Sequence, residues 1–555
     1  LRRRKRRSNK PLAIMVACIE DAEQLCVVSD TERALLTGTV RPIVLMRRRA
    51  DVAANAPLAE EGAQALSLAH AAAFDLPEAG IMLPYTPLQH LLLAACRAHG
   101  VHALVMTSGN ISEEPIEIDD ELAWRHLVEG GLADALLGNN RAILTRFDDS
   151  VVRVVEGTPT LVRRARGYAP RPLDLPEGAH AENTPKQNRA PVVLACGAEQ
   201  KATLALTRET DQGAAQCLLS QHIGDIEHAA VLDAWHEARH RMEQLFDLAP
   251  TVLACDMHPA YLTSQWARNE AARSDMPLIE VQHHHAHIAS VLAEAAATGV
   301  LEAREPVLGI ALDGTGAGTD GSVWGGELMV ATCAGYTRAG HLCSWRLPGG
   351  AASVRDARRC ALSLLMTCGL VDHAGAAWLN DSLTPNERAI TRSMVERGVA
   401  SPLTSSMGRL LDALAAITGT CLRATYEGEP AIELEAAAWR YLDRTAAART
   451  SQAPRYQLAL TWQPTPEPSP ETQAAMTRVG ETAASEELII DPEPLLAGVL
   501  DDLTAGVDPE AIALEAHIAI ADALCDAAER IAAREGVQTI ALSGGVFMNR
   551  LLFTR

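Results

Sequence analysis

Four histidines within five residues give the strongest chemical signal in the sequence. They lie in the segment VQHHHAHIAS, in which His283 and His287 are four positions apart. On a helix that spacing places both imidazoles on one face, and His284 and His285 cannot join the same face as well. Neutral imidazole is a common ligand of transition metals. The spacing therefore predicts a divalent metal site, against the alternative of a solvated helix start with incidental histidines.

A metal held by two imidazoles needs further ligands, and we expect an oxygen. Asp313 ends the apolar segment GIALDG and is the best candidate, although it could instead cap the turn that follows. This turn, DGTGAGTDG, contains the pattern G-x-G-x-x-G, but the next segment, SVWGGELMVAT, has the pattern of a strand. No helix N-terminus would then face a dinucleotide. The turn is instead typical of a phosphate-binding β-hairpin, with Gly314 and Gly316 as candidate contacts.

A second glycine-rich junction lies near residue 544. The segment SGGVFMNR has the pattern of a strand, a glycine pair and a helix. Glycines at such a junction let a phosphate approach backbone N–H groups and the positive end of the helix. Gly544, Gly545 and Asn549 are therefore candidate nucleotide contacts, with a plain tight turn as the alternative.

Two glutamates follow a glycine-broken loop in the segment YEGEPAIELE. Glu429 and Glu433 could hold a ribose or a metal-bound water, or they could be surface carboxylates. The surface interpretation is preferred for Glu433.

A third group of candidates lies in the first 173 residues. The basic segment KRRSNKP precedes an apolar strand, and TSGN follows another, HALVM. Together with RFDDSVVRV these segments predict a concave anion site with many cationic donors, for which solvated surface charge is the alternative. The candidate residues of this site are Lys5, Arg7, Lys10, Ser108, Asn110, Arg146, Ser150 and Arg153.

Short β-rich runs alternate with helical stretches, which predicts the α/β class. We expect one α/β domain over residues 1–173, a polar linker over 174–190, and a two-lobed domain of actin-like architecture over 191–555. Strand-turn-strand units around glycine-rich turns, with helices between them, favour that second assignment. The Pro-rich segment WQPTPEPSPET at 462–472 predicts a surface insertion or a disordered loop.

Composition limits the classes of partner. The net charge of −21 argues against binding nucleic acid through the whole surface, because phosphate contacts need clustered Lys and Arg. The 12 cysteines form no C-x-x-C pair, which argues against a disulfide framework and fits a reducing cytoplasm. The sequence has no apolar run long enough to span a membrane, and it predicts no membrane partner.

The ordered motifs resemble known families. The first block resembles the YrdC family, which makes acyl-adenylates from ATP, through KRRSNKP and TSGNISEEP. The second block resembles the TsaD family of actin-like carbamoyl transferases, through VQHHHAHIAS. The two in this order resemble the HypF-type carbamoyltransferases of [NiFe]-hydrogenase maturation, also through RARGYAPRPL, SQHIGDIEH, CDMHPAYLTS and LSGGVFMNRLL.

The resemblance implies a reaction and its participants. ATP, with Mg²⁺, and carbamate would form carbamoyl-adenylate in the first domain, with Lys5, Arg7, Ser108 and Asn110 in catalysis. The intermediate would cross internally to the second domain, where Zn or Fe would be held by the His-x-x-x-His motif. The acceptor would be the C-terminal cysteine thiolate of a HypE-type protein, and in the full-length protein carbamate would come from carbamoyl phosphate.

The resemblance also carries departures and rivals. HypF proteins begin with an acylphosphatase domain and Cys-rich zinc fingers, and they carry a late Asp-containing metal motif. None of these is in the sequence, and we expect the chain to be part of a longer protein. The rival functions are a tRNA threonylcarbamoyl-adenosine enzyme and a nucleotide-binding scaffold without turnover.

Overall fold

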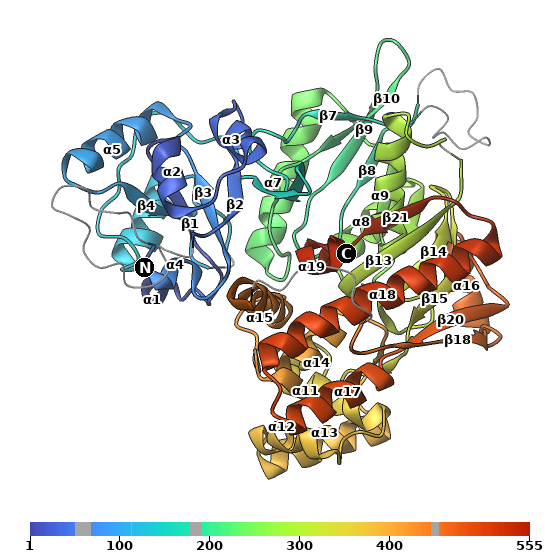
Figure 1. Cartoon of the computed structure of the whole chain (residues 1–555). Helices are drawn as coiled ribbons and strands as arrows, with labels where there is room; N and C mark the ends of the chain where they lie inside the picture. The colour runs from blue at the N-terminus through green and yellow to red at the C-terminus, as the bar shows by residue number, and fades with distance from the viewer. Residues whose placement is uncertain (50–67, 113, 177–189, 303, 446–453, 555) are drawn as a thin grey trace.

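Three sheets organise the chain in the computed structural model, which describes residues 1–49, 68–112, 114–176, 190–302, 304–445 and 454–554 (Figure 1). The predicted linker over 174–190 falls mostly outside these residues. Strands and helices are mixed throughout, which confirms the predicted α/β class. In the described part of the chain, no helix combines the length and the apolar character that crossing a bilayer requires.

The first sheet has six strands and is built from the N-terminal third of the chain. In spatial order they are β4 (Ala103–Met106), β1 (Ala13–Val16), β3 (Glu78–Met82), β2 (Ile43–Arg47), β5 (Val151–Val155) and β6 (Thr158–Arg163). Leu25 of α2 (Ile19–Leu25) and Leu36 of α3 (Asp30–Thr37) are packed in one core of this sheet. Leu93 of α5 (Pro87–Ala98) packs with Met15 and Met82 in a separate small cluster. The two apolar clusters therefore fix the position of the strand ends next to the N-terminal candidate residues.

The second sheet also has six strands. They are β12 (Leu278–Val281), β11 (Val252–Asp256), β8 (Val193–Ala195), β9 (Ala205–Glu209), β10 (Ala215–Leu219) and β7 (Pro172–Asp174). Trp235 of α7 (Ala229–Phe246) and Ala267 of α8 (Leu262–Ser274) fill its core. The edge strand β7 directly follows the N-terminal block in sequence and pairs antiparallel with β10, so the chain enters the second sheet before residue 175.

The third sheet has nine strands and carries the largest core. Its centre is the hairpin of β13 (Val307–Ala317) and β14 (Val323–Ala331), and β21 (Ile540–Ser543) pairs parallel with β13. The remaining strands are β15 (Tyr336–Leu342), β16 (Trp345–Arg346), β17 (Leu403–Thr404), β18 (Ala459–Pro464), β19 (Glu481–Thr482) and β20 (Glu486–Asp491). Most of the helical residues in its core come from α11 (Ala357–Thr367), α14 (Met407–Thr418), α15 (Glu429–Thr445), α17 (Glu493–Thr504) and α18 (Pro509–Glu535). The hairpin confirms the strand predicted after the glycine-rich turn.

The Pro-rich segment 462–472 was predicted to be a surface insertion or a disordered loop; it lies on the surface, and the disordered-loop alternative was wrong. Strand β18 ends at Pro464, and its register against β20 runs to that residue. Helix α16 (Pro470–Val479) then begins with Pro470 in its first turn, where a missing N–H costs nothing, and Ser469 caps it. The prolines therefore stand at the end of one element and the start of another, where they are compatible with ordered structure.

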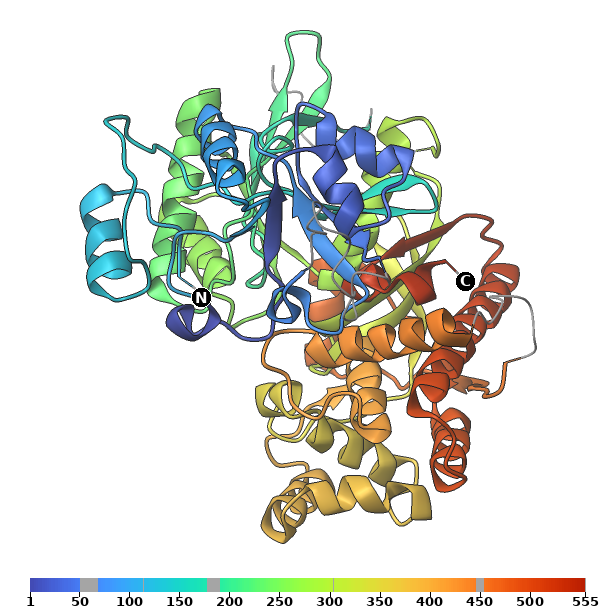
Figure 2. The same ribbon diagram turned by 60° about the vertical axis from the view of Figure 1, so that its left-hand side comes forward.

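The N-terminal sheet lies beside α15 in both views (Figures 1 and 2). Glu78 of β3 contacts two arginines, Arg153 of β5 at 2.6 Å and Arg550 of the C-terminal segment at 2.7 Å. Asn9 Nδ2 donates to Glu429 Oε1 over 3.1 Å. These hydrogen-bonded charges tie the N-terminal third to the rest of the chain.

The junction at Gly544 tolerates no side chain. Its φ is +107°, and an added Cβ would overlap the carbonyl oxygen of Leu312 on β13. Gly536, which follows α18 with a φ of +71°, has open space around its missing Cβ. We expect Gly544→Ala to lower the free energy of unfolding by about 1–3 kcal/mol more than the matched Gly536→Ala, because only the first adds overpacking to backbone strain. Chemical denaturation of both variants measures this, and equal losses would contradict it.

Candidate metal centre and nucleotide sites

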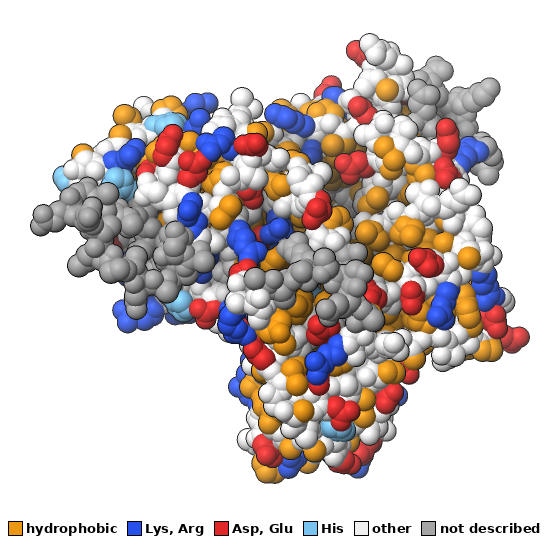
Figure 3. Space-filling model, in the orientation of Figure 1, with side chains coloured by type: hydrophobic (Ala, Val, Ile, Leu, Met, Phe, Trp, Pro, Cys, Tyr) orange, Lys and Arg blue, Asp and Glu red, His pale blue; other side chains and the backbone are white. Residues whose placement is uncertain are grey.

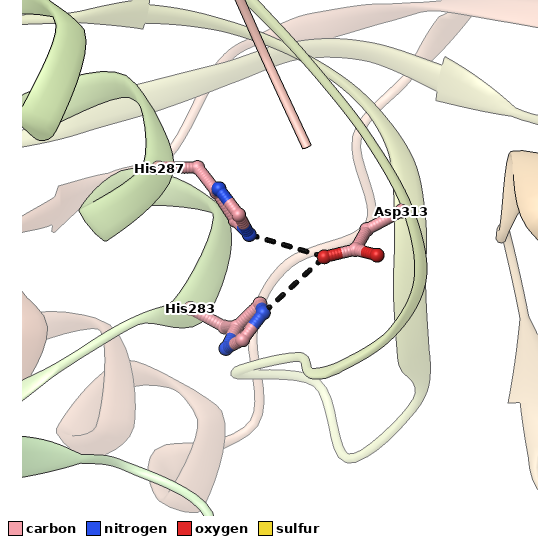
Figure 4. A group of neighbouring side chains, drawn as sticks. All are labelled: His283, His287 and Asp313. Atoms are coloured by element: carbon pink, nitrogen blue, oxygen red, sulfur yellow. Dashed lines mark hydrogen bonds and ion pairs between the residues drawn. The ribbon is translucent and has the colours of Figure 1, made fainter. Parts of the chain in front are cut away.

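The two histidines of the His-x-x-x-His motif face one carboxylate. Helix α9 (His283–Ala297) begins at His283, so His283 and His287 lie one above the other on its first turns (Figure 4). Nε2 of His287 is 3.0 Å and Nε2 of His283 is 3.4 Å from Oδ2 of Asp313, which lies on β13. The three ligand atoms all lie within 4.8 Å of one another. The structure thus brings together the three residues that the sequence nominated for a metal.

The other ring nitrogens of both histidines are held by neighbouring strands. Nδ1 of His283 bonds to Oδ2 of Asp256 at 2.9 Å, and Nδ1 of His287 lies 3.3 Å from Oγ of Ser543. Outer contacts of this kind fix the ring orientation and leave Nε2 free for a cation. Two imidazoles and a carboxylate form a donor set that suits Zn or Fe, so these residues fit a divalent transition metal.

The charges of the group reinforce one another. Burial by itself would lower the pKa of His283, but hydrogen bonds to Asp256 and Asp313 outweigh it and raise this pKa to about 10. Burial by itself would raise the pKa of Asp313, but hydrogen bonds to His283 and His287 hold that pKa well below its usual value. A cation that replaces these protons would meet an ionised carboxylate already in place.

The remaining histidines of the cluster serve the packing of the helix. His284 is fully buried, accepts a hydrogen bond at Nδ1 from the Gln282 amide, and has its pKa lowered by burial to about 3. His285 Nε2 bonds to the carbonyl of Thr332 at 2.8 Å. This confirms that His284 and His285 do not share the face of His283 and His287.

Glycines let the surrounding chain close on Asp313. A Cβ on Gly316 would overlap His284 Cε1, and a Cβ on Gly545 would lie 3.1 Å from Asp313 Oδ1. The N–H of Gly314 donates to Asp313 Oδ1 over 2.7 Å. Gly314, Gly316 and Gly545 therefore border Asp313 or the helix that faces it, whereas Gly544 borders Leu312 of β13. The predicted nucleotide role of all four glycines stays a prediction.

Asn549 holds the backbone of the C-terminal segment. Its Oδ1 accepts from the N–H groups of Leu551 and Leu552, which caps α19 (Arg550–Phe553). Its Nδ2 lies 2.8 Å from Nε2 of His517, a buried histidine whose pKa burial lowers to about 4. One amide hydrogen of Asn549 has no bond named here. The predicted contact of Asn549 with a nucleotide stays a prediction.

Four N-terminal candidates meet at the end of β4. Lys5 Nζ donates to Thr107 Oγ1 at 3.2 Å, to the Ser108 carbonyl at 2.6 Å and to Asn110 Oδ1 at 3.2 Å. The Ser108 hydroxyl donates to Asn110 Oδ1 over 2.8 Å. Arg7 Nη1 lies 3.5 Å from Thr107 Oγ1. The basic segment and the TSGN turn, about a hundred residues apart in sequence, thus form one polar cluster.

Three further candidates have other partners. Arg146 pairs with Glu237 of α7, and its Nε donates to the Ile116 carbonyl over 2.9 Å. The Ser150 hydroxyl is buried, donating to the Arg166 carbonyl and accepting from the Ala165 N–H. Arg153 pairs with Glu78 and donates to the Met548 carbonyl. Arg146, Ser150 and Arg153 thus join neighbouring segments, and their predicted role in nucleotide binding stays a prediction.

Lys10 and His222, a histidine that the sequence did not point to, both interact with Asp148. Burial, Arg163 and Arg7 lower the pKa of Lys10. Asp148, which Lys10 and Arg163 also approach, bonds through Oδ2 to Nδ1 of His222 at 2.8 Å. His222 belongs to the second sheet's loops, so only the folded contact between halves brings it here.

Of the two candidate glutamates, Glu429 is buried. It accepts from Asn9 and from the N–H of Thr425. Glu433 is half-buried, and burial raises its pKa. Glu429 therefore lies at the contact with the N-terminal third, and the surface interpretation preferred for Glu433 stays a prediction.

Comparison with known proteins assigns the chain. A family model described as "HypF Kae1-like domain" matches residues 188–294, and one described as "Carbamoyltransferase, Kae1-like Domain, second subdomain" matches 309–555. The Sua5/YciO/YrdC model, described as "Telomere recombination", matches 1–165. A "Carbamoyltransferase HypF homolog" of Cupriavidus necator is 35% identical over 380 residues, covering 67% of this chain and 85% of the relative. The chain belongs to the HypF carbamoyltransferase family.

Longer family members align along the whole chain. HypF of Rhizobium leguminosarum bv. viciae is 34% identical and HypF of Rhodobacter capsulatus 37% identical, each over 100% of this chain, which spans 62% and 64% of them. Crystal structures of full-length HypF in a phosphate- and nucleotide-bound form and of T. kodakarensis HypF superpose with TM-scores of 0.80, at 33% and 30% identity. Each superposition includes 100% of this chain, which covers 62% of the first structure's chain and 63% of the second's.

Anion binding at the Lys5 cluster should weaken as the pH rises. Burial, with the charge of Arg7, lowers the pKa of Lys5 to about 8. Lys5 is therefore charged at pH 7 and loses its charge as the pH rises through this value. We expect the affinity of the chain for ATP to fall about ten-fold between pH 7 and pH 10, measured by calorimetry.

Lys5→Arg is the matched control, because a guanidinium stays charged over this range. The affinity of Lys5→Arg for ATP should depend less on pH than that of the unchanged chain. A small dependence should remain because the pKa of Lys10 is also lowered. An unchanged slope in Lys5→Arg would contradict the assignment of the titration to Lys5.

Proposed function

We propose that the chain is an ATP-dependent carbamoyltransferase of hydrogenase maturation. It forms carbamoyl-adenylate from ATP and carbamate in the N-terminal third and transfers the carbamoyl group to the C-terminal cysteine thiol of a HypE-type acceptor. The observation that carries this proposal is the Lys5 cluster, in which a desolvated ammonium sits among hydroxyl and amide oxygens in a chain of the HypF family.

In the first step an oxygen of carbamate attacks the α-phosphorus of ATP, and the bond to the β-phosphate breaks. Pyrophosphate leaves with the electron pair, and its charge, shared with Mg²⁺, needs cationic donors. We assign this role to Lys5, Arg7 and Lys10, and we assign the small polar groups of Ser108 and Asn110 to the binding of carbamate. Arg146, Ser150 and Arg153 are assigned to nucleotide binding in this domain.

In the second step the acceptor thiolate attacks the carbamoyl carbon, and AMP leaves with the electrons of the C–O bond. His283, His287 and Asp313 would hold a divalent metal, Zn or Fe, which supplies Lewis-acid stabilisation of negative charge. Asp256 and Ser543 orient the two rings. Gly314, Gly316, Gly544 and Gly545 leave space for phosphate oxygens at backbone N–H groups.

The contacts between the halves support an internal hand-over of the intermediate. Glu78 joins β3 and β5 of the first sheet to Arg550, six residues after Gly544. Carbamoyl-adenylate is labile, so a fixed relation between the two sites limits its loss to water.

The charge supports a protein or small-molecule partner over nucleic acid. The net charge is −21, and on the face drawn in Figure 3 acidic side chains are interspersed with basic ones. We assign the chain to the cytoplasm, with no nucleic-acid or membrane partner.

The proposal is tested by ATP–pyrophosphate exchange with alternative co-substrates. We expect label exchange with carbamate, supplied as ammonium bicarbonate, and none with threonine plus bicarbonate. Lys5→Met should lower the exchange rate by at least about ten-fold, because a charged hydrogen-bond donor is lost.

His283→Ala is the matched control, because it alters the other half of the chain and should leave exchange intact. Exchange only with threonine would move the chain to tRNA modification. Exchange with neither substrate, with ATP still bound, would favour a nucleotide-binding scaffold.

A further inference from the structure

Two sequence motifs that the proposed reaction leaves unused meet at the boundary between the halves. His222 of SQHIGDIEH lies between β10 and α7, and its N–H donates over 3.2 Å to the carbonyl of Arg164, the first residue of RARGYAPRPL. Its ring Nδ1 lies 2.8 Å from Oδ2 of Asp148, which precedes β5 of the first sheet. The second sheet therefore reaches a carboxylate of the N-terminal third through one imidazole.

The turn that carries His222 is held by its backbone. The N–H of Ile223 donates to the Ala202 carbonyl, and the N–H of Ala202 donates to the Gly224 carbonyl, each over 2.9 Å. Gly224 has a φ of +127°, a conformation that favours glycine. The fold of the second sheet therefore determines where the imidazole lies.

The pair of His222 and Asp148 is more enclosed than a second ion pair between the N-terminal third and the rest of the chain. The two side chains are 15% and 22% exposed, against 34% and 52% for Arg47 and Asp443. Exposed ion pairs contribute little, whereas an enclosed carboxylate depends on its partners to stay ionised. Loss of His222 should therefore change how Asp148 interacts with its other neighbours.

Those other neighbours are cations. Arg163 Nη1 lies 3.7 Å from the same Oδ2 of Asp148 that His222 contacts. Burial by itself would raise the pKa of Asp148, but the hydrogen bond with His222 and the charges of Arg163, His222 and Lys10 lower it. Asp148 is thus an ionised carboxylate that His222, Arg163 and Lys10 share.

Lys10 is surrounded by charges from both halves of the chain. Burial lowers its pKa, and so do the charges of Arg163, Arg7 and Lys201, which outweigh that of Asp225. Cations that repel one another are stabilised by a bound polyanion, and the pyrophosphate end of ATP is such a group.

We propose that His222 is a positioning residue of the N-terminal site, contributed by the second sheet. By holding Oδ2 of Asp148, it limits the pairing of this carboxylate with Lys10 and Arg163 and leaves both cations open to the pyrophosphate end of ATP. The role in turnover rests on the proposed function, whereas the binding of inorganic pyrophosphate does not.

The test is ATP–pyrophosphate exchange by the full chain, with the KM for pyrophosphate and the KM for carbamate measured separately. In His222→Ala, Asp148 competes with pyrophosphate for the cations. We expect the KM for pyrophosphate to rise about ten-fold, the effect of one charged hydrogen bond, and the KM for carbamate to stay unchanged. An equal rise in both constants, or no rise for pyrophosphate, would overturn the proposal.

Two further variants test whether His222 acts through Asp148. His222→Asn places an amide N–H at about the position of Nδ1 and should restore the KM for pyrophosphate. Adding His222→Ala to Asp148→Asn should raise this KM no further, because no charged oxygen is left to compete. Failure of His222→Asn to restore it, or a further rise in the Asp148→Asn background, would contradict a role through Asp148.

Asp443→Asn is the matched control, because it breaks the pair with Arg47 at the same boundary. It should leave the KM for pyrophosphate unchanged, and a rise equal to that of His222→Ala would make His222 a boundary contact only.

A wild-type chain without exchange would reject the proposed function, and calorimetry with inorganic pyrophosphate would then decide the inference. Binding about ten-fold weaker in a cooperatively unfolding His222→Ala would support the positioning role, and equal affinity would overturn it.

Discussion

The carboxylate of Asp313 is the point on which the C-terminal lobes converge. One oxygen faces the Nε2 atoms of His283 and His287, and the other accepts the N–H of Gly314. Helix α9 can come this close because Gly309 of β13 lies under Ile288, where a Cβ would be 2.5 Å from Cγ1. A half-buried carboxylate is stabilised by such partners, so the helix, the hairpin and the junction at Gly544 are constrained together.

Shared carboxylates also connect the N-terminal third to the rest of the chain. Glu78 is shared by Arg153 and Arg550, and Glu429 accepts from Asn9. Two of these contacts, Glu78 with Arg550 and Asn9 with Glu429, join the N-terminal third to the rest of the chain. In the proposed reaction they keep two distinct sites in a fixed relation, which a labile adenylate requires.

Much of the metal centre could be predicted from the sequence because its signals are local. The four-residue spacing determines the helix face of His283 and His287, and Asp313 stands at the end of an apolar run. Asp256 and Ser543 were missed as ring-orienting partners, because strand pairing brings them in from far along the chain. The only signal was that each also ends an apolar strand.

The N-terminal site divides in the same way. The basic segment and the TSGN turn each carry a motif, and they meet as expected. Arg146 and Arg153 were nominated as anion donors from charge alone, but sequence cannot reveal that Glu237 and Glu78 lie opposite them. For the Pro-rich segment, the disordered-loop alternative failed because proline is also a regular residue at strand ends and helix starts.

The most direct test of the metal centre is anomalous diffraction from crystals of the chain grown with Zn²⁺. The account predicts a peak at the zinc edge about 2.0–2.2 Å from Nε2 of His283, Nε2 of His287 and a carboxylate oxygen of Asp313. A peak bonded to His284 or His285, or the absence of zinc from this group while it binds elsewhere on the chain, would contradict it.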